Sequence, residues 1–147
     1  MDNVESAIIS VRPPFADSIV SGSKTVEFRR RIPLVAKGTC LWIYSTKPVG
    51  AIVGRAFVKE IERGTPREIW RSCQAHGGIS KVEFDRYFEN THEAIGIHLH
   101  KVQRQNSIDI EMLRTLRAGF HPPQVILRIT AAEAAALYRM SKDPIAA

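Results

Sequence analysis

The stretch SGSKTVEFRRRIP, residues 21–33, combines the signals for a helix end, a strand and a dense group of charges. Gly22 readily adopts the left-handed backbone conformation that commonly ends a helix, so a helix over about 15–21 is expected to stop here. The segment VEFR then alternates apolar and charged residues with the period of two that is typical of a strand. The sequence therefore predicts a helix, a tight turn and a strand whose charged side chains share one face.

Outward from this stretch, β-type runs and capped helices follow one another irregularly. Five further strands are predicted in the runs AIISV, TCLWIYS, AIVGRAFVKEI, EAIGIHLHKV and QVILRI. Capping boxes at Thr65, Ser80 and Thr130 predict helices over about 66–75, 81–89 and 131–141, and a short helical turn is expected in DIEMLRTL. This order excludes the regular alternation of a doubly wound sheet. It predicts a compact α+β domain around a curled, barrel-like sheet of five to six strands with three to four helices.

Size and charge narrow the class of protein. The chain has 147 residues, about one domain, and a formal net charge of +6, which favours contact with polyanions. Its two cysteines cannot supply a disulfide framework or a zinc site made of thiolates. The polar N-terminus lacks the layout of a secretory signal, and no apolar run is long enough for a membrane span. We therefore expect a cytoplasmic protein with no membrane partner.

Four blocks of sequence, taken in order, resemble the ASCH domain, a branch of the PUA-like superfamily. The blocks are ISVRPPFADSIVSGSKTVEFRRR, LWIYSTKPVGAIVG, GISKVEFDRYF and GFHPPQ. The family pattern Gly-x-Lys-x-x-Glu-x-Arg is matched by Gly22, Lys24, Glu27 and Arg29. The resemblance implies a PUA-like curled mixed sheet or pseudo-β-barrel with a cleft beside the first helix. It also implies one domain over 1–147, with its core at about 6–129 and a C-terminal helix at about 131–141, and a role in binding or processing RNA.

The motif residues suit an anionic or nucleotide-like ligand. Lys24 is held close to the turn, where its ammonium group can meet a phosphate. Arg29 offers a planar fork to a phosphate or a base edge, and Glu27 on the same strand face can orient Arg29 or take a proton from a reacting group. The alternative is an ordinary surface ion pair between Glu27 and Arg29, with Lys24, Arg30 and Arg31 as solvated charges.

A second group of candidates surrounds the end of the strand LWIY. Tyr44 could stack on a base while Ser45 and Lys47 meet the nucleic-acid backbone; alternatively, Tyr44 only caps the core. Arg12 is expected to emerge at a strand end near the same cleft. The predicted nucleic-acid contacts are therefore Arg12, Lys24, Arg29, Tyr44, Ser45 and Lys47.

The first function that these residues predict is an RNA-binding module, whose partner is RNA or a nucleotide-like ligand. Such a module would act in RNA processing or in regulation linked to translation. The alternative is an enzyme with Lys24, Glu27 and Tyr44 as catalytic residues: a ribonuclease cleaving single-stranded RNA, or an amidohydrolase acting on an acylated cytidine nucleoside. Amidohydrolases of the family resemble this chain in Lys24, but they use a threonine at the position of Glu27 and a later glutamate at about Gly77 or Gly78. A regulator that works through a protein partner is a third alternative.

The histidines offer one candidate for metal binding. His98 and His100 share one face of a predicted strand, and this spacing can supply two metal ligands. A third ligand is not evident from the sequence. We therefore expect no dedicated metal site and no cofactor.

Overall fold

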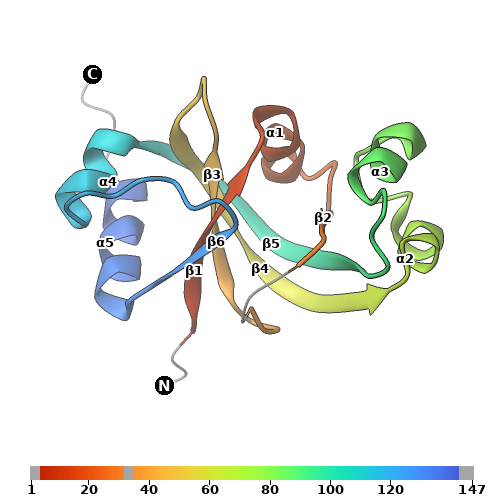
Figure 1. The fold of residues 1–147 in the computed structure, drawn as a ribbon. Coiled ribbons are helices and arrows are strands. Elements are labelled where there is room, and N and C mark those ends of the chain that lie inside the picture. The colour runs from red at the N-terminus through yellow and green to blue at the C-terminus, as the bar shows by residue number, and fades with distance from the viewer. Residues whose placement is uncertain (1–3, 32–34, 143–147) are drawn as a thin grey trace.

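The computed structural model describes residues 4–31 and 35–142 and contains one mixed sheet (Figure 1). Its strand order is β2-β5-β4-β3-β1-β6, in which β1 and β3 are parallel and all other neighbours antiparallel. The strands are β1 (Ser6–Val11), β2 (Val26–Arg29), β3 (Cys40–Ser45), β4 (Ala51–Gly64), β5 (Ala94–Asp109) and β6 (Ile126–Ile129). The predicted curled mixed sheet of five to six strands is confirmed, with six strands. Among the described residues β2 and β6 are its edges, so the sheet does not close into a barrel.

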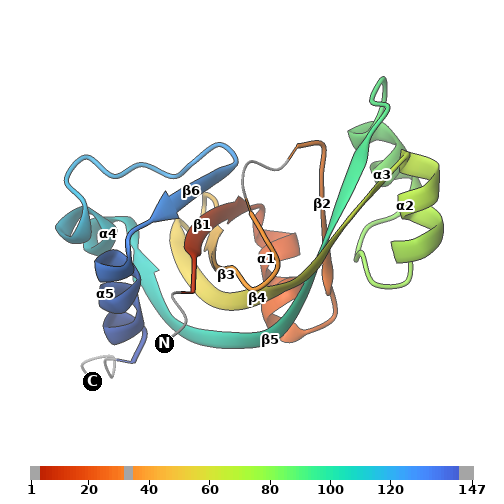
Figure 2. The same ribbon diagram turned by 90° about the horizontal axis from the view of Figure 1, so that it is seen from below.

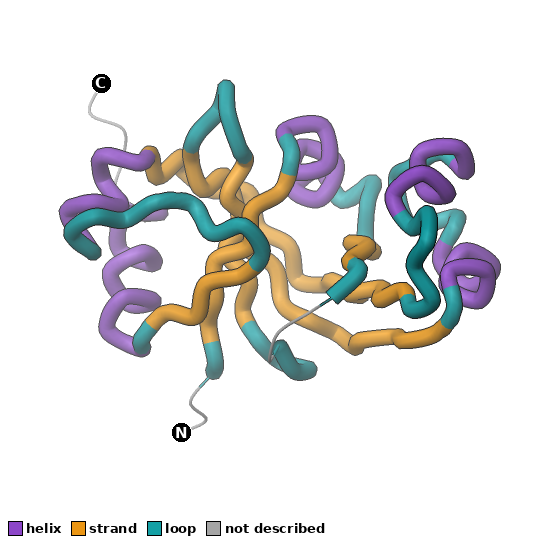
Figure 3. The backbone as a smooth tube through the Cα atoms, viewed as in Figure 1, coloured by secondary structure: helices purple, strands orange, loops and turns teal. Residues whose placement is uncertain are grey.

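Five helices are described, rather than the three to four expected. They are α1 (Pro13–Ser21), α2 (Pro66–Cys73), α3 (Lys81–Tyr87), α4 (Ile110–Leu116) and α5 (Ala131–Lys142). Helices α2 and α3 lie together at one end of the sheet, and helices α4 and α5 lie together at the opposite end (Figure 3). Helix α1 lies between these two pairs (Figure 3). The additional helix is α4, where only a turn was expected. Its first turn is stabilised by Asp109, whose carboxylate accepts a hydrogen bond from the Met112 amide at 2.9 Å.

The two longest strands, β4 and β5, bend together into a trough (Figure 2). Their register shifts at three places, between Ile52 and Gly54, between Arg55 and Phe57, and between Val58 and Glu60. An extra residue on one strand bends the pair and increases its twist, so these irregularities account for the curl. The bend gives the sheet the curled shape that the sequence predicted.

Helix α1 packs closely on the sheet and thereby positions the segment that follows it. A Cβ atom at Gly54 would lie 2.6 Å from Val20 and 2.7 Å from the carbonyl oxygen of Gln103, so only glycine permits this approach. The helix ends as predicted at Gly22, whose φ is 88°. The amide of Lys24 then donates to the Ser18 carbonyl at 2.9 Å. The chain therefore enters β2 with the Lys24 backbone held against α1.

Helices α2 and α3 are attached to the other end of the trough by a small aromatic core. Phe28 of β2 lies edge-on to Phe84 and Phe88, with ring centroids 5.0 and 6.4 Å apart. The predicted capping box at Thr65 is present, with both of its reciprocal hydrogen bonds. The aromatic core places the connection between α2 and α3 directly beside β2.

No helix in the described part of the chain is long and apolar enough to cross a membrane.

Candidate nucleotide-sized pocket beside the edge strand

A pocket of about 440 Å³ lies where α1, β2 and α3 meet. The side chains around it are predominantly charged or aromatic, with basic groups outnumbering acidic ones. Its lining residues are Ser10, Val11, Arg12, Phe15, Lys24, Glu27, Phe28, Arg29, Ile79, Glu83, Arg86 and Tyr87. The structure therefore brings Lys24, Glu27 and Arg29 of the motif to one cavity, together with Arg12.

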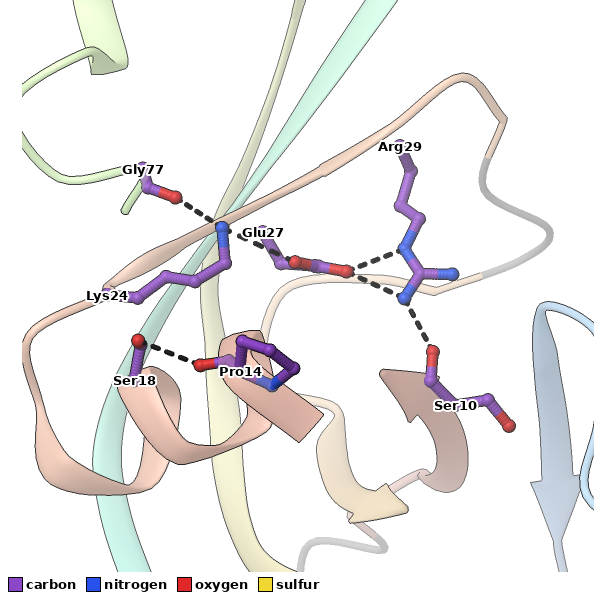
Figure 4. A network of polar contacts seen from close by, with 7 residues as sticks. All are labelled: Ser10, Pro14, Ser18, Lys24, Glu27, Arg29 and Gly77. Carbon is purple, nitrogen blue, oxygen red and sulfur yellow. Dashed lines mark hydrogen bonds and ion pairs between the residues drawn. The ribbon is translucent and has the colours of Figure 1, made fainter. Parts of the chain in front are cut away.

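Lys24 is the most deeply placed charge of the pocket, with only 1 % of its surface exposed. Its ammonium nitrogen donates to the Gly77 carbonyl and lies 3.5 Å from Glu27 Oε1 (Figure 4). The same nitrogen lies over the rings of Phe15 and Phe28, at 4.9 and 5.2 Å from their centroids. The alternative in which Lys24 is a solvated surface charge is therefore wrong.

The environment of Lys24 changes its acidity. Burial is the larger influence and lowers the pKa of the Lys24 amine, because a charged ammonium is poorly solvated there. The nearby Glu27 carboxylate acts in the opposite direction and partly offsets this effect. A lysine whose pKa is lowered has a larger neutral fraction near physiological pH, so it can accept a proton from a substrate.

Glu27 bridges the two cations of the motif. Its Oε2 accepts hydrogen bonds from Arg29 Nε at 2.9 Å and Nη2 at 2.7 Å, while its Oε1 faces Lys24. Arg29 Nη2 also donates to the Ser10 carbonyl at 2.8 Å, which ties β2 to the end of β1 (Figure 4). The Glu27 and Arg29 side chains are only 8 % and 13 % exposed, so this ion pair is far less solvated than an ordinary surface pair.

Two glycines allow the connection between α2 and α3 to approach Lys24. A Cβ atom at Gly77 would lie 2.3 Å from the Phe28 ring, and one at Gly78 would lie 3.1 Å from Lys24 Cβ. The His76 carbonyl also accepts from the amides of Thr25 and Val26, at 3.0 and 3.1 Å. The backbone of Gly77 thus supplies the hydrogen-bond partner of the Lys24 amine.

The remaining predicted residues lie outside this lining. Tyr44 is 3 % exposed and packs in the core on the other face of the sheet, with α4 and α5, and burial raises the pKa of its hydroxyl. Ser45 is buried at the end of β3, and Lys47 is exposed in the following turn. This turn is joined to the end of β1, because the Thr46 amide donates to the carbonyl of Val11, the residue before Arg12, at 3.0 Å.

Sequence reasoning missed the contribution of α3. Arg86 and Tyr87 line the pocket, and Tyr87 also stacks under the Arg30 guanidinium at 4.8 Å. The capping box at Ser80 predicted the helix, but nothing local to its sequence shows which face lies opposite β2. The detectable signal was the spacing of Phe84 and Phe88, which places Tyr87 at the border of the apolar face; the same spacing gives no indication that Arg86 lines the pocket.

Comparisons with known proteins agree with this fold and motif. The model of the ASCH domain matches residues 9–105, so the chain belongs to the ASCH domain family. An ASCH domain-containing ribonuclease from Zymomonas mobilis is 41 % identical over 120 residues, which cover 82 % of this chain and 81 % of that protein. A segment of 94 residues, 63 % of this chain, is 30 % identical to part of the large ribosomal subunit protein uL22 of Ureaplasma parvum and covers 30 % of that protein.

Solved structures give the same result. The crystal structure of ASCH from Zymomonas mobilis superposes with a TM-score of 0.91 at 37 % identity, covering 93 % of this chain and 96 % of that one. A serine-to-alanine variant of the Zymomonas protein gives 0.92 at 36 % identity, covering 97 % and 100 %. The N-terminal domain of McrB from Staphylothermus marinus shares the fold alone, with a TM-score of 0.59 at 9 % identity over 95 % of this chain and 98 % of that one.

Proposed function

We propose that this protein binds single-stranded RNA and holds one nucleotide of the strand in the pocket beside β2. The observation that carries the proposal is the convergence of Arg12, Lys24, Glu27 and Arg29 on one cavity. A volume of about 440 Å³ is within the range of roughly 300 to 1,000 Å³ that is usual for small-ligand pockets. The net charge of +6 adds a general attraction for the phosphate backbone.

The preference for a single strand follows from the walls of the pocket. Phe15, Phe28 and Tyr87 offer aromatic surface on which a base can stack, alongside the charged groups. Only an unpaired base can leave its strand and enter such a cavity, because a base within a duplex is stacked and paired. A duplex of the same sequence is therefore expected to bind more weakly.

The neighbouring turn gives the strand a path out of the pocket. Arg12 lies at the pocket border, and the turn that carries Lys47 is hydrogen-bonded to the residue before it. A strand that leaves the pocket past Arg12 would bring its next phosphates toward Lys47. This path gives Lys47, which lies outside the cavity, a role in binding the RNA backbone.

Substituting Arg12 or Lys47 by alanine should weaken binding of a single-stranded RNA about tenfold each, since each loses a charge-assisted contact to phosphate. The measurement is fluorescence anisotropy of a labelled oligonucleotide at several salt concentrations. The slope of log affinity against log salt should fall by about 0.7 for each lost phosphate contact. Arg139→Ala is the matched control, because Arg139 is exposed on α5 and does not line the pocket. Equal losses in the Arg139 variant would show that only net charge matters, and the proposed path would be wrong.

Cleavage of the bound RNA is the second candidate function, favoured by the relative that is named a ribonuclease. The pocket supplies a lysine with a lowered pKa beside a fixed arginine. In the proposed step the neutral Lys24 amine takes the proton of a ribose 2′-hydroxyl, and the resulting oxygen attacks the adjacent phosphorus. The bond from phosphorus to the 5′-oxygen breaks, that oxygen takes a proton from water, and Arg29 stabilises the charge that develops on the phosphate.

This chemistry leaves a defined pair of products. Cleavage through the 2′-hydroxyl should give a 2′,3′-cyclic phosphate on one fragment and a 5′-hydroxyl on the other, which mass spectrometry of the fragments detects. An RNA with a 2′-O-methyl group at the cleaved position should resist. Fragments with 5′-phosphate ends, or cleavage of the methylated RNA, would contradict a reaction that starts at the 2′-hydroxyl and would leave RNA binding unaffected.

A further inference from the structure

A second group of reactive side chains lies on the face of β5 that is turned away from Glu27 and Arg29. His98 pairs across the strands with Val26, so its side chain shares the face of Val26 rather than that of Glu27. There it meets Glu62 of β4 and Cys73 at the end of α2, and the three potential ligand atoms all lie within 4.8 Å of one another. None of the three residues lines the pocket proposed for RNA. We infer that Cys73, His98 and Glu62 form a zinc-binding site.

The distances between the three ligand atoms fit one tetrahedral ion. Cys73 Sγ lies 3.4 Å from Glu62 Oε1 and 3.8 Å from His98 Nε2, and the latter two atoms are 2.9 Å apart. Tetrahedral zinc has bonds of about 2.3 Å to sulfur and about 2.0 to 2.2 Å to nitrogen and oxygen, which separate its ligand atoms by about 3.3 to 3.6 Å. The three atoms therefore need to move only a few tenths of an ångström around the ion.

A fourth protein ligand is within reach. Glu60 lies directly across from His98 in the sheet, and its Oε1 is 3.8 Å from His98 Nε2. The Glu60 side chain is 61 % exposed, so it is free to rotate toward the ion. Because Glu60 is the exposed member of the group, the ion is expected to enter from its side.

The mixed sulfur, nitrogen and oxygen donors favour zinc over magnesium or calcium, which prefer oxygen ligands alone. The thiol is not placed as a nucleophile, because Cys73 is buried and does not line the pocket proposed for RNA. Without metal the thiol donates to Glu62. Zinc would replace this proton, which passes to solvent, so that the thiolate, the carboxylate and the neutral imidazole share the ion.

Such an ion would brace the end of α2 against the sheet. The Cys73 carbonyl accepts from the His76 amide at 2.9 Å, and the His76 carbonyl in turn holds the start of β2. Gly77, the partner of Lys24, follows directly. Zinc is thus expected to act as a structural clamp on the loop beside the RNA pocket, without taking part in the chemistry there.

The test is zinc binding by the full chain after chelator treatment and removal of the chelator. Isothermal titration should give one Zn²⁺ per chain, and an excess of free Zn²⁺ of about 100 times the Kd should raise Tm by roughly 5 to 10 °C. Cobalt substitution should produce visible tetrahedral bands and a near-ultraviolet band from the thiolate. Cys73→Ser and His98→Gln should each weaken zinc binding at least about tenfold. Cys40→Ser is the matched control, because Cys40 is also a buried free thiol but packs on the other face of the sheet.

The outcomes separate cleanly. Because Tm measured without metal reports whether each variant still folds, a folded Cys73→Ser chain that no longer binds zinc supports the site. Zinc binding that survives both substitutions, a cobalt spectrum without the thiolate band, or no zinc binding by the wild-type chain would overturn it. The zinc ligands do not line the RNA pocket, so these results leave the assignment of the pocket residues unchanged.

Discussion

Replacing Lys24 by methionine is expected to reduce cleavage of single-stranded RNA by at least about 100-fold, the usual effect of losing a general base. Methionine fills the space of the lysine stem, and Glu27 keeps its two hydrogen bonds to Arg29, so the fold should persist. RNA affinity should change less than tenfold, because Arg12 and Arg29 remain. The measurement is the single-turnover cleavage rate of a labelled RNA, alongside anisotropy and Tm. Lys59→Met, at an exposed position of β4, is the control and should behave like wild type.

The pH dependence distinguishes a proton acceptor from a structural lysine. If the neutral amine is the base, the cleavage rate rises with pH and levels off above the pKa of Lys24. Glu27 raises this pKa against the lowering by burial, so Glu27→Gln should lower it further and move the rising limb to lower pH. A profile that stays in place in Glu27→Gln, or activity that persists in Lys24→Met, would remove Lys24 from the reaction.

Gly77→Ala is the second substitution with a large expected effect. The new Cβ would lie 2.3 and 2.5 Å from two atoms of the Phe28 ring, which already contacts Phe84 and Phe88 and so has little freedom to move. Overpacking of this kind costs about 1 to 3 kcal/mol, which corresponds to a fall in Tm of roughly 3 to 10 °C. The Gly77 carbonyl is displaced at the same time, so Lys24 loses its backbone partner and cleavage should fall as well.

A double-mutant cycle tests the physical cause. Phe28→Leu shortens the obstructing ring and is itself destabilising, but it should leave space for the alanine. The loss of stability in the combined Gly77→Ala and Phe28→Leu variant should therefore be smaller than the sum of the two single losses by at least about 0.5 kcal/mol. Additive losses, or a Gly77→Ala chain as stable as wild type, would show that the close approach of this loop to β2 is not required.

The local elements could be predicted from the sequence because their signals are local. The alternation around Glu27 and Arg29, the helix end at Gly22 and the capping box at Thr65 each depend on residues only a few positions apart. Helix α4 was underestimated because its sequence carries no Ser/Thr capping box. Its start is Asp109, the last residue of a long strand, where strand and helix meet without a loop.

Only those residues of the site that lie on or next to β2 could be predicted from the sequence. The motif brought Lys24, Glu27 and Arg29 together because they lie within six residues, but Gly77 is 53 positions from Lys24 and reaches it through the packing of α2 and α3. The same limit applies to His98: the strand pattern indicated His100 as its partner, whereas the fold supplies Cys73 and Glu62 from two other elements. Tyr44 was predicted to stack on a base because it ends a strand beside Ser45 and Lys47, yet its side chain lies in the core on the other face of the sheet.

The most direct test of the account is to map the RNA-binding surface by NMR. Amide chemical shifts of the isotope-labelled chain would be followed while a short single-stranded RNA is added. The account predicts that the shifts change chiefly around Arg12, from Lys24 to Arg29 and from Gly77 to Tyr87. A second basic hollow, which includes Arg55, Arg104 and Lys142, lies near α5 and is the main alternative surface for binding RNA. Shift changes confined to that hollow, with the residues around Lys24 unaffected, would contradict the proposed pocket.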